Sequence, residues 1–137
     1  MPHLLDCKKI ELPKIPDLRG NLSFFENESQ IPFRIRRTYL IYDVPGGEIR
    51  GGHAFRQQHE FIVALSGSFD VVVKDASGDT CVFQLNRSYN GLYVPNMLWR
   101  HLENFSTNAV CLVVTSTDFS PDDYIRDFQE FENLSIA

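Results

Sequence analysis

The chain has 137 residues, 43% hydrophobic and 12% aromatic, which is enough for one domain with a real core and argues against a disordered segment. The net charge of −5 argues against a nucleic-acid-binding protein. Three widely spaced cysteines form no paired framework, and no apolar run near the start is long enough for a signal peptide or membrane span. The composition predicts a soluble, cytoplasmic, single-domain protein that binds neither nucleic acid nor membrane.

Short β-type runs separated by Gly, Pro and small polar residues fill the chain between residues 33 and 116. Turn-forming residues interrupt them at 45–47, 66–68 and 75–79. Many short strands at close spacing are typical of a sandwich or barrel. We predict an all-β fold, a double-stranded β-helix of the jelly-roll type, with strands at 33–43, 52–56, 59–65, 68–74, 80–85, 91–94, 98–104 and 109–116.

The two ends of the chain carry different structural signals. Residues 8–22 alternate as a strand does, but no local partner for that strand is evident. Near the other end, Ser120 offers an N-cap and Pro121 a first helical residue, with acids following in the first turn. We predict a short C-terminal helix from this point, with an apolar stripe made of Tyr124, Ile125, Phe128 and Phe131. Residues 132–137 carry no signal and are compatible with a linker to a further domain of a longer native chain.

Residues 53–67 and 91–104 have the spacing of the two cupin metal-binding motifs. Phe55 stands where the second histidine ligand belongs, and Arg100 stands where the last histidine ligand belongs. Neither a phenyl ring nor a protonated guanidinium binds a metal cation. Only two of the four usual ligands remain, His53 and Glu60, fewer than a stable divalent site needs. The sequence therefore predicts a cupin barrel that keeps its pocket but holds no metal.

Strand alternation indicates which side chains face the barrel interior. Arg37, Tyr39 and Ile41 share one strand face, so Arg37 and Tyr39 would form an anion clamp beside a phenol. The alternative is an aromatic packing pair with an exposed arginine. His53 and Phe55 share a face of the next strand, and an imidazole with a pKa of about 6.5 suits proton transfer at neutral pH.

Arg100 shares a strand face with Leu98, Leu102 and Asn104, so an arginine and an amide alternate with core leucines. A buried guanidinium without a partner is costly. Arg100 therefore needs an anion, which is either Glu60 or a bound ligand.

Five arginines against two acids fall between residues 34 and 56. A local arginine cluster in an acidic protein suits a small polyanion such as a pyrophosphate better than a long phosphate backbone. The alternative is a set of solvated strand faces. The arginines are Arg34, Arg36, Arg37, Arg50 and Arg56.

An ordered set of motifs covers nearly the whole chain, at 17–22, 35–39, 44–47, 50–54, 65–71, 91–95, 99–100 and 122–127. Each motif is weak alone, but together they resemble the dTDP-sugar 3,4-ketoisomerases, also called FdtA-like or WxcM-like proteins. The resemblance implies a metal-free cupin homodimer with exchanged N-terminal strands and no cofactor. It also implies a reaction in which the carbonyl of dTDP-4-keto-6-deoxy-D-glucose moves from C4 to C3, on the way to a 3-amino-3,6-dideoxyhexose of a surface polysaccharide.

The resemblance further implies roles for individual residues. His53 matches the first histidine of a His-Ala-His signature and would be the acid and base. Tyr39 would be a hydroxyl partner of the sugar oxygens, and Arg19 and Arg100 would face the hexose. Arg37 and Arg50 would hold the pyrophosphate. We thus predict catalytic roles for His53, Tyr39 and Arg100, and substrate-binding roles for Arg19, Arg37, Arg50, Glu60 and Asn104.

Phe55 departs from this family because it replaces the second histidine of the signature, so a two-histidine proton shuttle cannot operate. Either His53 carries the proton across one sugar face alone, or Tyr39, His59 or water supplies the second transfer. Arginine at both 19 and 100 leaves the product configuration at C4, gluco or galacto, open.

Two other functions fit the same residues. A dTDP-sugar 3,5-epimerase-like enzyme would also be a metal-free cupin that uses histidine with tyrosine, and it would exchange the proton at C5. A non-catalytic sugar-nucleotide-binding cupin would bind its ligand tightly without turnover, and Phe55 would then mark the lost activity.

Overall fold

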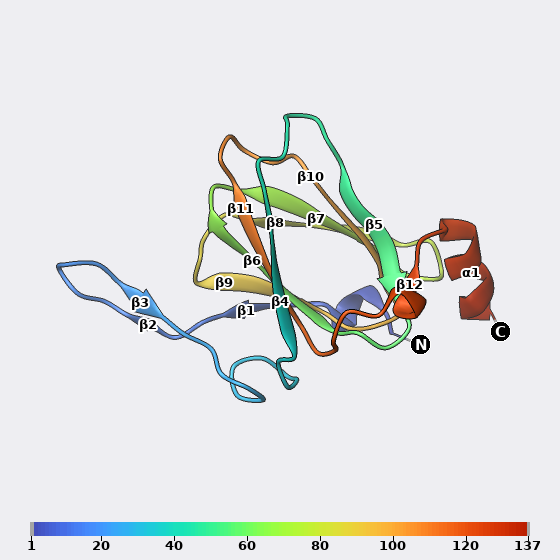
Figure 1. Cartoon of the computed structure of the whole chain (residues 1–137), viewed down its shortest axis with the longest axis horizontal. Helices are drawn as coiled ribbons and strands as arrows, with labels where there is room; N and C mark the ends of the chain where they lie inside the picture. The colour runs from blue at the N-terminus through green and yellow to red at the C-terminus, as the bar shows by residue number, and fades with distance from the viewer. Residues whose placement is uncertain (1, 137) are drawn as a thin grey trace.

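The computed structural model describes residues 2–136 and consists mainly of two five-stranded antiparallel sheets (Figure 1). One sheet has the order β1-β9-β6-β11-β4 and the other has the order β12-β5-β10-β7-β8. From β4 onward each strand lies in the opposite sheet from the one before it, except that β8 stays beside β7. This is the path of a double-stranded β-helix, so the predicted all-β jelly-roll fold is confirmed. The strands are β1 (Lys8–Glu11), β2 (Lys14–Ile15), β3 (Leu22–Ser23), β4 (Arg37–Tyr42), β5 (Arg50–Phe55), β6 (Glu60–Ser66), β7 (Phe69–Lys74), β8 (Thr80–Leu85), β9 (Asn90–Val94), β10 (Trp99–Glu103), β11 (Val110–Thr115) and β12 (Tyr124–Ile125).

All eight strands that the sequence predicts between residues 33 and 116 are present, as β4 to β11. The largest difference is at β4, which begins at Arg37 and not at Phe33. The side-chain oxygen of Asn27 accepts the backbone N–H of Ile35 at 2.8 Å, so this donor is not available to a strand ladder. The backbone N–H of Arg36, the next residue, donates to Thr115 of β11 at 2.9 Å, so the chain already lies along β11 just before the strand begins.

The strand predicted over residues 8–22 is interrupted, which corrects that prediction. β1 pairs with β9, with Ile10 opposite Gly91. Pro13 and Pro16 follow β1, and a proline has no N–H to donate to a ladder. The chain then forms β2 and β3, which pair only with each other and make a hairpin that extends away from the barrel (Figure 1).

The main core lies between the two sheets and is built by alternation along the strands. In β8, Cys81, Phe83 and Leu85 turn inward while their neighbours are exposed. Phe69 and Ile62, from opposite sheets, are fully buried in the same core. Period-two alternation therefore places one apolar face of each sheet against the other, which is the arrangement expected for sheets packed face to face.

The C-terminal segment corrects the predicted helix start. Ser120 precedes only a short 3₁₀ turn, η2 (Pro121–Asp123), and a second such turn, η1 (Leu4–Asp6), lies near the N-terminus. The carboxylate of Asp123 accepts the backbone N–H groups of Gln57 and Gln58 at 2.8 and 3.1 Å, which ties the turn to the end of β5. The next two residues form β12 beside β5. Tyr124 and Ile125 therefore belong to a strand and not to a helical stripe.

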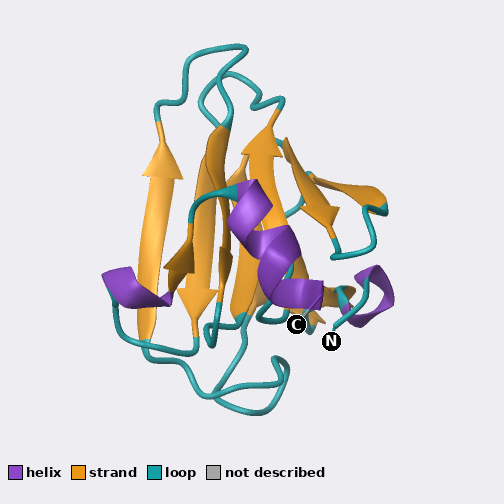
Figure 2. Ribbon diagram, turned by 90° about the vertical axis from the view of Figure 1, so that its right-hand side faces the viewer, coloured by secondary structure: helices purple, strands orange, loops and turns teal. Residues whose placement is uncertain are grey.

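The helix itself, α1 (Phe128–Ile136), begins after this strand. Figure 2 shows it lying across the outside of the strands. Its residue Phe131 packs into a separate apolar cluster with Trp99 of β10 and Ile125 of β12. In the part of the chain that the structure describes, no helix is both long and apolar enough to cross a membrane.

Candidate active site

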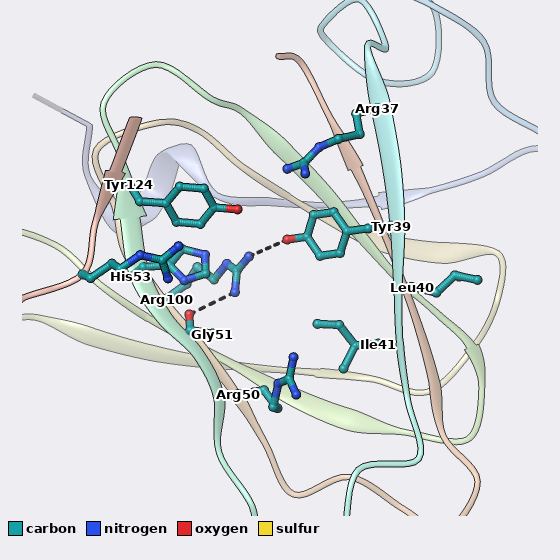
Figure 3. Close-up of a pocket in the computed structure, with 10 residues that line it drawn as sticks. Arg37, Tyr39, Leu40, Ile41, Arg50, Gly51, His53, Arg100 and Tyr124 are labelled. Atoms are coloured by element: carbon teal, nitrogen blue, oxygen red, sulfur yellow. Dashed lines mark hydrogen bonds between the residues drawn. The ribbon is translucent and has the colours of Figure 1, made fainter. Parts of the chain in front are cut away.

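A cavity of about 340 Å³ opens between β4, the edge strand of one sheet, and β5 with β12 of the other sheet. Figure 3 shows side chains reaching into it from both sides. Four of the lining residues are arginines and none is an aspartate or glutamate. The lining consists of Arg37, Tyr39, Leu40, Ile41, Arg50, Gly51, His53, Arg100, Tyr124 and Arg126.

A buried ion pair lies beside this cavity. Arg100 Nε and Nη2 donate to the two carboxylate oxygens of Glu60 at 2.8 and 3.0 Å, and both residues are only 1% exposed. The Tyr39 hydroxyl donates to Glu60 at 2.9 Å and accepts from Arg100 Nη2 at 3.0 Å. Of the two partners that the sequence leaves open for Arg100, the structure has Glu60, which does not itself line the cavity.

Gly51 completes this network from β5. Its carbonyl oxygen accepts a hydrogen bond from Arg100 Nη1 at 3.0 Å, and its φ of +71° lies in the left-handed region. A Cβ atom at this position would collide with the same guanidinium nitrogen. Position 51 therefore accommodates only glycine while Arg100 keeps its place.

The imidazole of His53 faces the cavity as a base. Its Nε2 atom is buried and has no hydrogen-bond partner among the described residues. Burial, followed by the charges of Arg100 and Arg126, lowers the pKa of His53 from 6.5 to about 2. The ring is therefore neutral at physiological pH, with one nitrogen available to accept a proton.

Two further aromatic rings pack edge to face around this imidazole. The ring centroids lie 4.7 Å apart for His53 and Phe55, 5.0 Å for His53 and Tyr124, and 4.6 Å for Phe55 and Tyr124. Phe55 is 4% exposed and fills the space behind the other two rings. Tyr124 reaches the cavity only because β12 pairs with β5, and no periodicity in the sequence indicates that pairing.

The mouth of the cavity is suited to an anion. Nε and Nη2 of Arg37 are buried without a hydrogen-bond partner in the described part of the chain. The guanidinium packs over the rings of Tyr39 and Phe119, 5.1 and 5.2 Å from their centroids, but its two buried nitrogens lack a hydrogen-bond acceptor, so the group favours a negatively charged ligand. Of the predicted arginine cluster, only Arg37 and Arg50 line the cavity, whereas Arg36 pairs with Asp118 and Arg56 with Glu130. Arg100 and Arg126 add positive charge from elsewhere in the sequence.

Three residues singled out from the sequence lie outside this cavity. Arg19 sits in the protruding β2–β3 hairpin, 91% exposed, and pairs with Asp17 at 3.0 Å. Asn104 follows β10 with a φ of +57°, which turns its amide outward to Asp70 at 3.2 Å. His59 bonds the hydroxyl of Tyr93 at 2.7 Å. The substrate contact expected of Asn104 and the proton transfer considered for His59 therefore have no support from the geometry.

The residues at the cupin ligand positions do not fit a divalent cation. In residues 2–136, no group of three or more His, Cys, Asp or Glu could hold a metal ion. The carboxylate of Glu60 is engaged by Arg100, whose fixed positive charge also acts on His53. The guanidinium thus takes the position that a cation would need.

The family of the chain follows from comparison with known proteins. The model of the FdtA family, described as WxcM-like, C-terminal, matches residues 5–135, nearly the whole chain. The chain belongs to the FdtA family. This membership confirms the resemblance drawn from the sequence motifs and makes the chain a sugar 3,4-ketoisomerase, an isomerase.

Similar proteins support this assignment over nearly their full length. The chain is 35% identical over 131 residues to TDP-4-oxo-6-deoxy-α-D-glucose-3,4-oxoisomerase of Aneurinibacillus thermoaerophilus, covering 93% of this chain and 91% of that protein. The TDP-quinovose 3,4-ketoisomerase WlaRB of Campylobacter jejuni is 36% identical with a TM-score of 0.89, covering 93% and 98% of the two chains. A histidine-to-asparagine variant of the 3,4-ketoisomerase QdtA of Thermoanaerobacterium thermosaccharolyticum, in complex with TDP-4-keto-6-deoxyglucose, is 28% identical with a TM-score of 0.93, covering 97% and 96%.

We expect His53 to stay neutral in the ligand-free protein as the pH falls from about 8 to about 5, because burial and two arginines lower its pKa. A lowered pKa means that the base form persists at pH values where an exposed histidine has gained its proton. Imidazole ¹⁵N shifts followed by NMR, with His53 assigned from the His53→Asn variant and free histidine as the reference, measure this directly. A His53 titration midpoint at or above about 6 would contradict the expectation.

Proposed function

We propose that the chain converts dTDP-4-keto-6-deoxy-D-glucose into its 3-keto isomer through an enediol, without a metal or other cofactor. The observation that carries this proposal is the unpaired, buried Nε2 of His53 facing a cavity lined by four arginines. A cavity of about 340 Å³ is in the size range of small-ligand sites. The QdtA variant bound to TDP-4-keto-6-deoxyglucose supports the choice of substrate.

His53 would remove the proton from C3 and return it to C4 of the hexose. A neutral imidazole can accept the first proton and, as imidazolium, deliver the second. Because it lies on one side of the cavity, both transfers would occur on one face of the sugar. Because Phe55 replaces the second histidine of the signature, His53 is the one histidine among the described residues that line the cavity.

Arg100 would stabilise the negative charge that develops on the sugar oxygens. A guanidinium has five N–H donors, and four of those of Arg100 are engaged by Glu60, Tyr39 and Gly51. The remaining N–H on Nη1 is available for an enediolate oxygen, in the manner of an oxyanion hole. Glu60 would act on the substrate only through Arg100, by holding it in place.

Tyr39 would position the substrate by accepting a hydrogen bond. Its single hydroxyl proton is given to Glu60, and one lone pair already accepts from Arg100. One acceptor position is left, which suits a sugar hydroxyl. Arg37 and Arg50, which line the same cavity, would bind the pyrophosphate.

The active form would be a homodimer in which the β2–β3 hairpin contacts the partner subunit. Within one chain this hairpin pairs with no other strand and exposes Ile15, Leu18 and Leu22. Exposed apolar side chains together on a protruding element are typical of a protein interface. Such a contact would bring Arg19 toward the partner's cavity, since it cannot reach the cavity of its own chain in this conformation. Three free cysteines support a cytoplasmic location.

Incubation with dTDP-4-keto-6-deoxyglucose in deuterium oxide, followed by NMR of the product, tests the function. We expect a 3-keto product with solvent deuterium at C3 or C4. The His53→Asn variant should lose turnover by about 100-fold or more, the size expected for losing acid–base catalysis, while it still binds dTDP. Asparagine is polar like histidine but cannot accept a proton at neutral pH. The fold should therefore be kept, and an unchanged circular dichroism spectrum checks this.

The same experiment separates the alternative functions. Deuterium at C5 would replace the ketoisomerase by a 3,5-epimerase-like enzyme. Tight binding of the sugar nucleotide with no turnover by the unaltered chain would indicate a binding protein. Near-normal turnover by His53→Asn would keep the reaction but reject His53 as its base.

Arg37→Ala should raise KM with little change in kcat, because a contact to the pyrophosphate is present in both the ground state and the transition state. Arg36→Ala is the matched control, since Arg36 is the neighbouring residue but pairs with Asp118 outside the cavity. Steady-state kinetics on both variants measure the difference. A large fall in kcat at constant KM in Arg37→Ala would assign this arginine to the chemistry instead.

Sedimentation equilibrium should find a dimer at micromolar concentration, and Leu18→Glu should shift it toward monomer. Leu18 is fully exposed within one chain, so its replacement removes no packing there. Val82→Glu, at an exposed position of β8, is the control and should remain dimeric. A monomeric unaltered protein, or an equal effect of both substitutions, would contradict the hairpin interface.

A further inference from the structure

Moving a carbonyl from C4 to C3 requires proton transfers at oxygen as well as at carbon. When the proton leaves C3, the carbonyl oxygen at C4 becomes an enediolate oxygen and needs a proton. When the proton arrives at C4, the hydroxyl at C3 must lose one. His53 accounts for the carbon transfers, so a second group is required at the two oxygens. This reasoning rests on the proposed function.

Two residues that line the cavity are poorly suited to that role. Arg100 donates hydrogen bonds but keeps its proton throughout the accessible pH range. Tyr39 has its only proton committed to Glu60, and burial followed by the negative charge of Glu60 raises the pKa of Tyr39 above its ordinary value of 10. Transfer of this proton to the sugar would leave a phenolate facing a carboxylate.

Tyr124 is the second phenol of the cavity, and its hydroxyl has a different environment. Within residues 2–136 it forms no hydrogen bond, and Figure 3 shows it directed across the cavity toward Tyr39. Its ring is held 5.0 Å from the His53 ring, centroid to centroid. A phenol in this position can reach the same bound sugar as the imidazole of His53.

The groups around Tyr124 keep its ring in place. Phe55 and Phe119 both pack edge to face on it, with ring centroids 4.6 and 5.9 Å from that of Tyr124. The guanidinium of Arg126 lies over the ring, 4.2 Å from its centroid. This cation–π contact adds to the packing that holds the ring. Phe55, in place of the signature histidine, thus belongs to the packing that holds Tyr124.

We propose that Tyr124 is the catalytic acid and base at the sugar oxygens. As His53 takes the proton from C3, the C–H electrons form the C3–C4 double bond and the carbonyl electrons move to O4, which takes the proton of Tyr124. The phenolate then takes the proton from the hydroxyl at C3, the electrons of that O–H bond form the C3 carbonyl, and the double bond takes the proton of His53 at C4. Both residues end in their starting protonation states, so no external acid, base or oxidant is consumed.

Tyr124→Phe tests the proposal because it removes one oxygen and keeps the ring that packs on His53 and Phe55. We expect kcat to fall by about 100-fold or more, the usual effect of losing an acid–base group, while dTDP binding measured by calorimetry changes by less than about threefold. Tyr42→Phe is the matched control, since Tyr42 lies on β4 but is exposed outside the cavity, and its kcat should be unaltered. A Tyr124→Phe enzyme with kcat within about threefold of the unaltered enzyme would overturn the proposal.

A second measurement distinguishes catalysis from a merely structural role. Site-specific 3,5-difluorotyrosine at position 124 keeps the hydroxyl but lowers the pKa of the phenol, so the alkaline limb of the kcat profile should move to lower pH. An unmoved profile would assign the loss in Tyr124→Phe to positioning and overturn the proposal. If the unaltered chain forms no 3-keto product, the proposed function fails; if it does and either Tyr124 test fails, only the role of Tyr124 is rejected.

Discussion

The ion pair between Arg100 and Glu60 is the interaction on which the cavity depends, because it joins the two sheets. Arg100 belongs to β10 of one sheet and Glu60 to β6 of the other. The same guanidinium reaches Tyr39 on β4 and Gly51 on β5, so four strands meet at one charged group. Removing one partner of such a buried pair costs about 3–5 kcal/mol, since the other charge remains uncompensated. The network therefore fixes β4 relative to β5, the two strands between which the cavity opens.

This one pair also determines what the neighbouring groups can do. The positive charge of Arg100 contributes, after burial, to the low pKa of His53 and so keeps the imidazole neutral. The Tyr39 hydroxyl donates its hydrogen bond to the carboxylate of Glu60, which leaves the Tyr39 oxygen as an acceptor for other groups. In a metal-binding cupin, a cation would provide the positive charge at this place and exchange its ligands. Here the guanidinium of Arg100, held by Glu60, provides the positive charge at this place.

Much of this arrangement can be predicted from local pattern. Period-two alternation is a property of each strand alone, so it correctly places Arg37, Tyr39 and His53 on inward faces. The rule that a buried arginine needs an anion is equally general. It left Glu60 or a ligand as the partner of Arg100, and the structure has Glu60. The position of Tyr124, by contrast, cannot be predicted from local pattern. It depends on Asp123 binding backbone N–H groups of Gln57 and Gln58, a long-range contact that leaves no periodic signal and overrides the N-cap pattern at Ser120. Asn104 shows the same limit, because one residue with positive φ ends the alternation that would have turned it inward.

The charges of the cavity connect substrate binding to the strength of the base. The pKa of about 2 for His53 arises from burial, Arg100 and Arg126 with no anion in the cavity. Arg100 is already balanced by Glu60, whereas Arg126 is exposed and forms no ion pair in residues 2–136. On the proposed function, a pyrophosphate held at the mouth of the cavity brings negative charge toward Arg126 and offsets its effect on His53. The contribution of Arg126 to the low pKa of His53 is then removed, whereas burial, the largest cause, and Arg100 remain. The arginines that act on the base, Arg100 and Arg126, thus line the same cavity as Arg37 and Arg50, which would bind the pyrophosphate, so charge brought in by the substrate reaches both pairs.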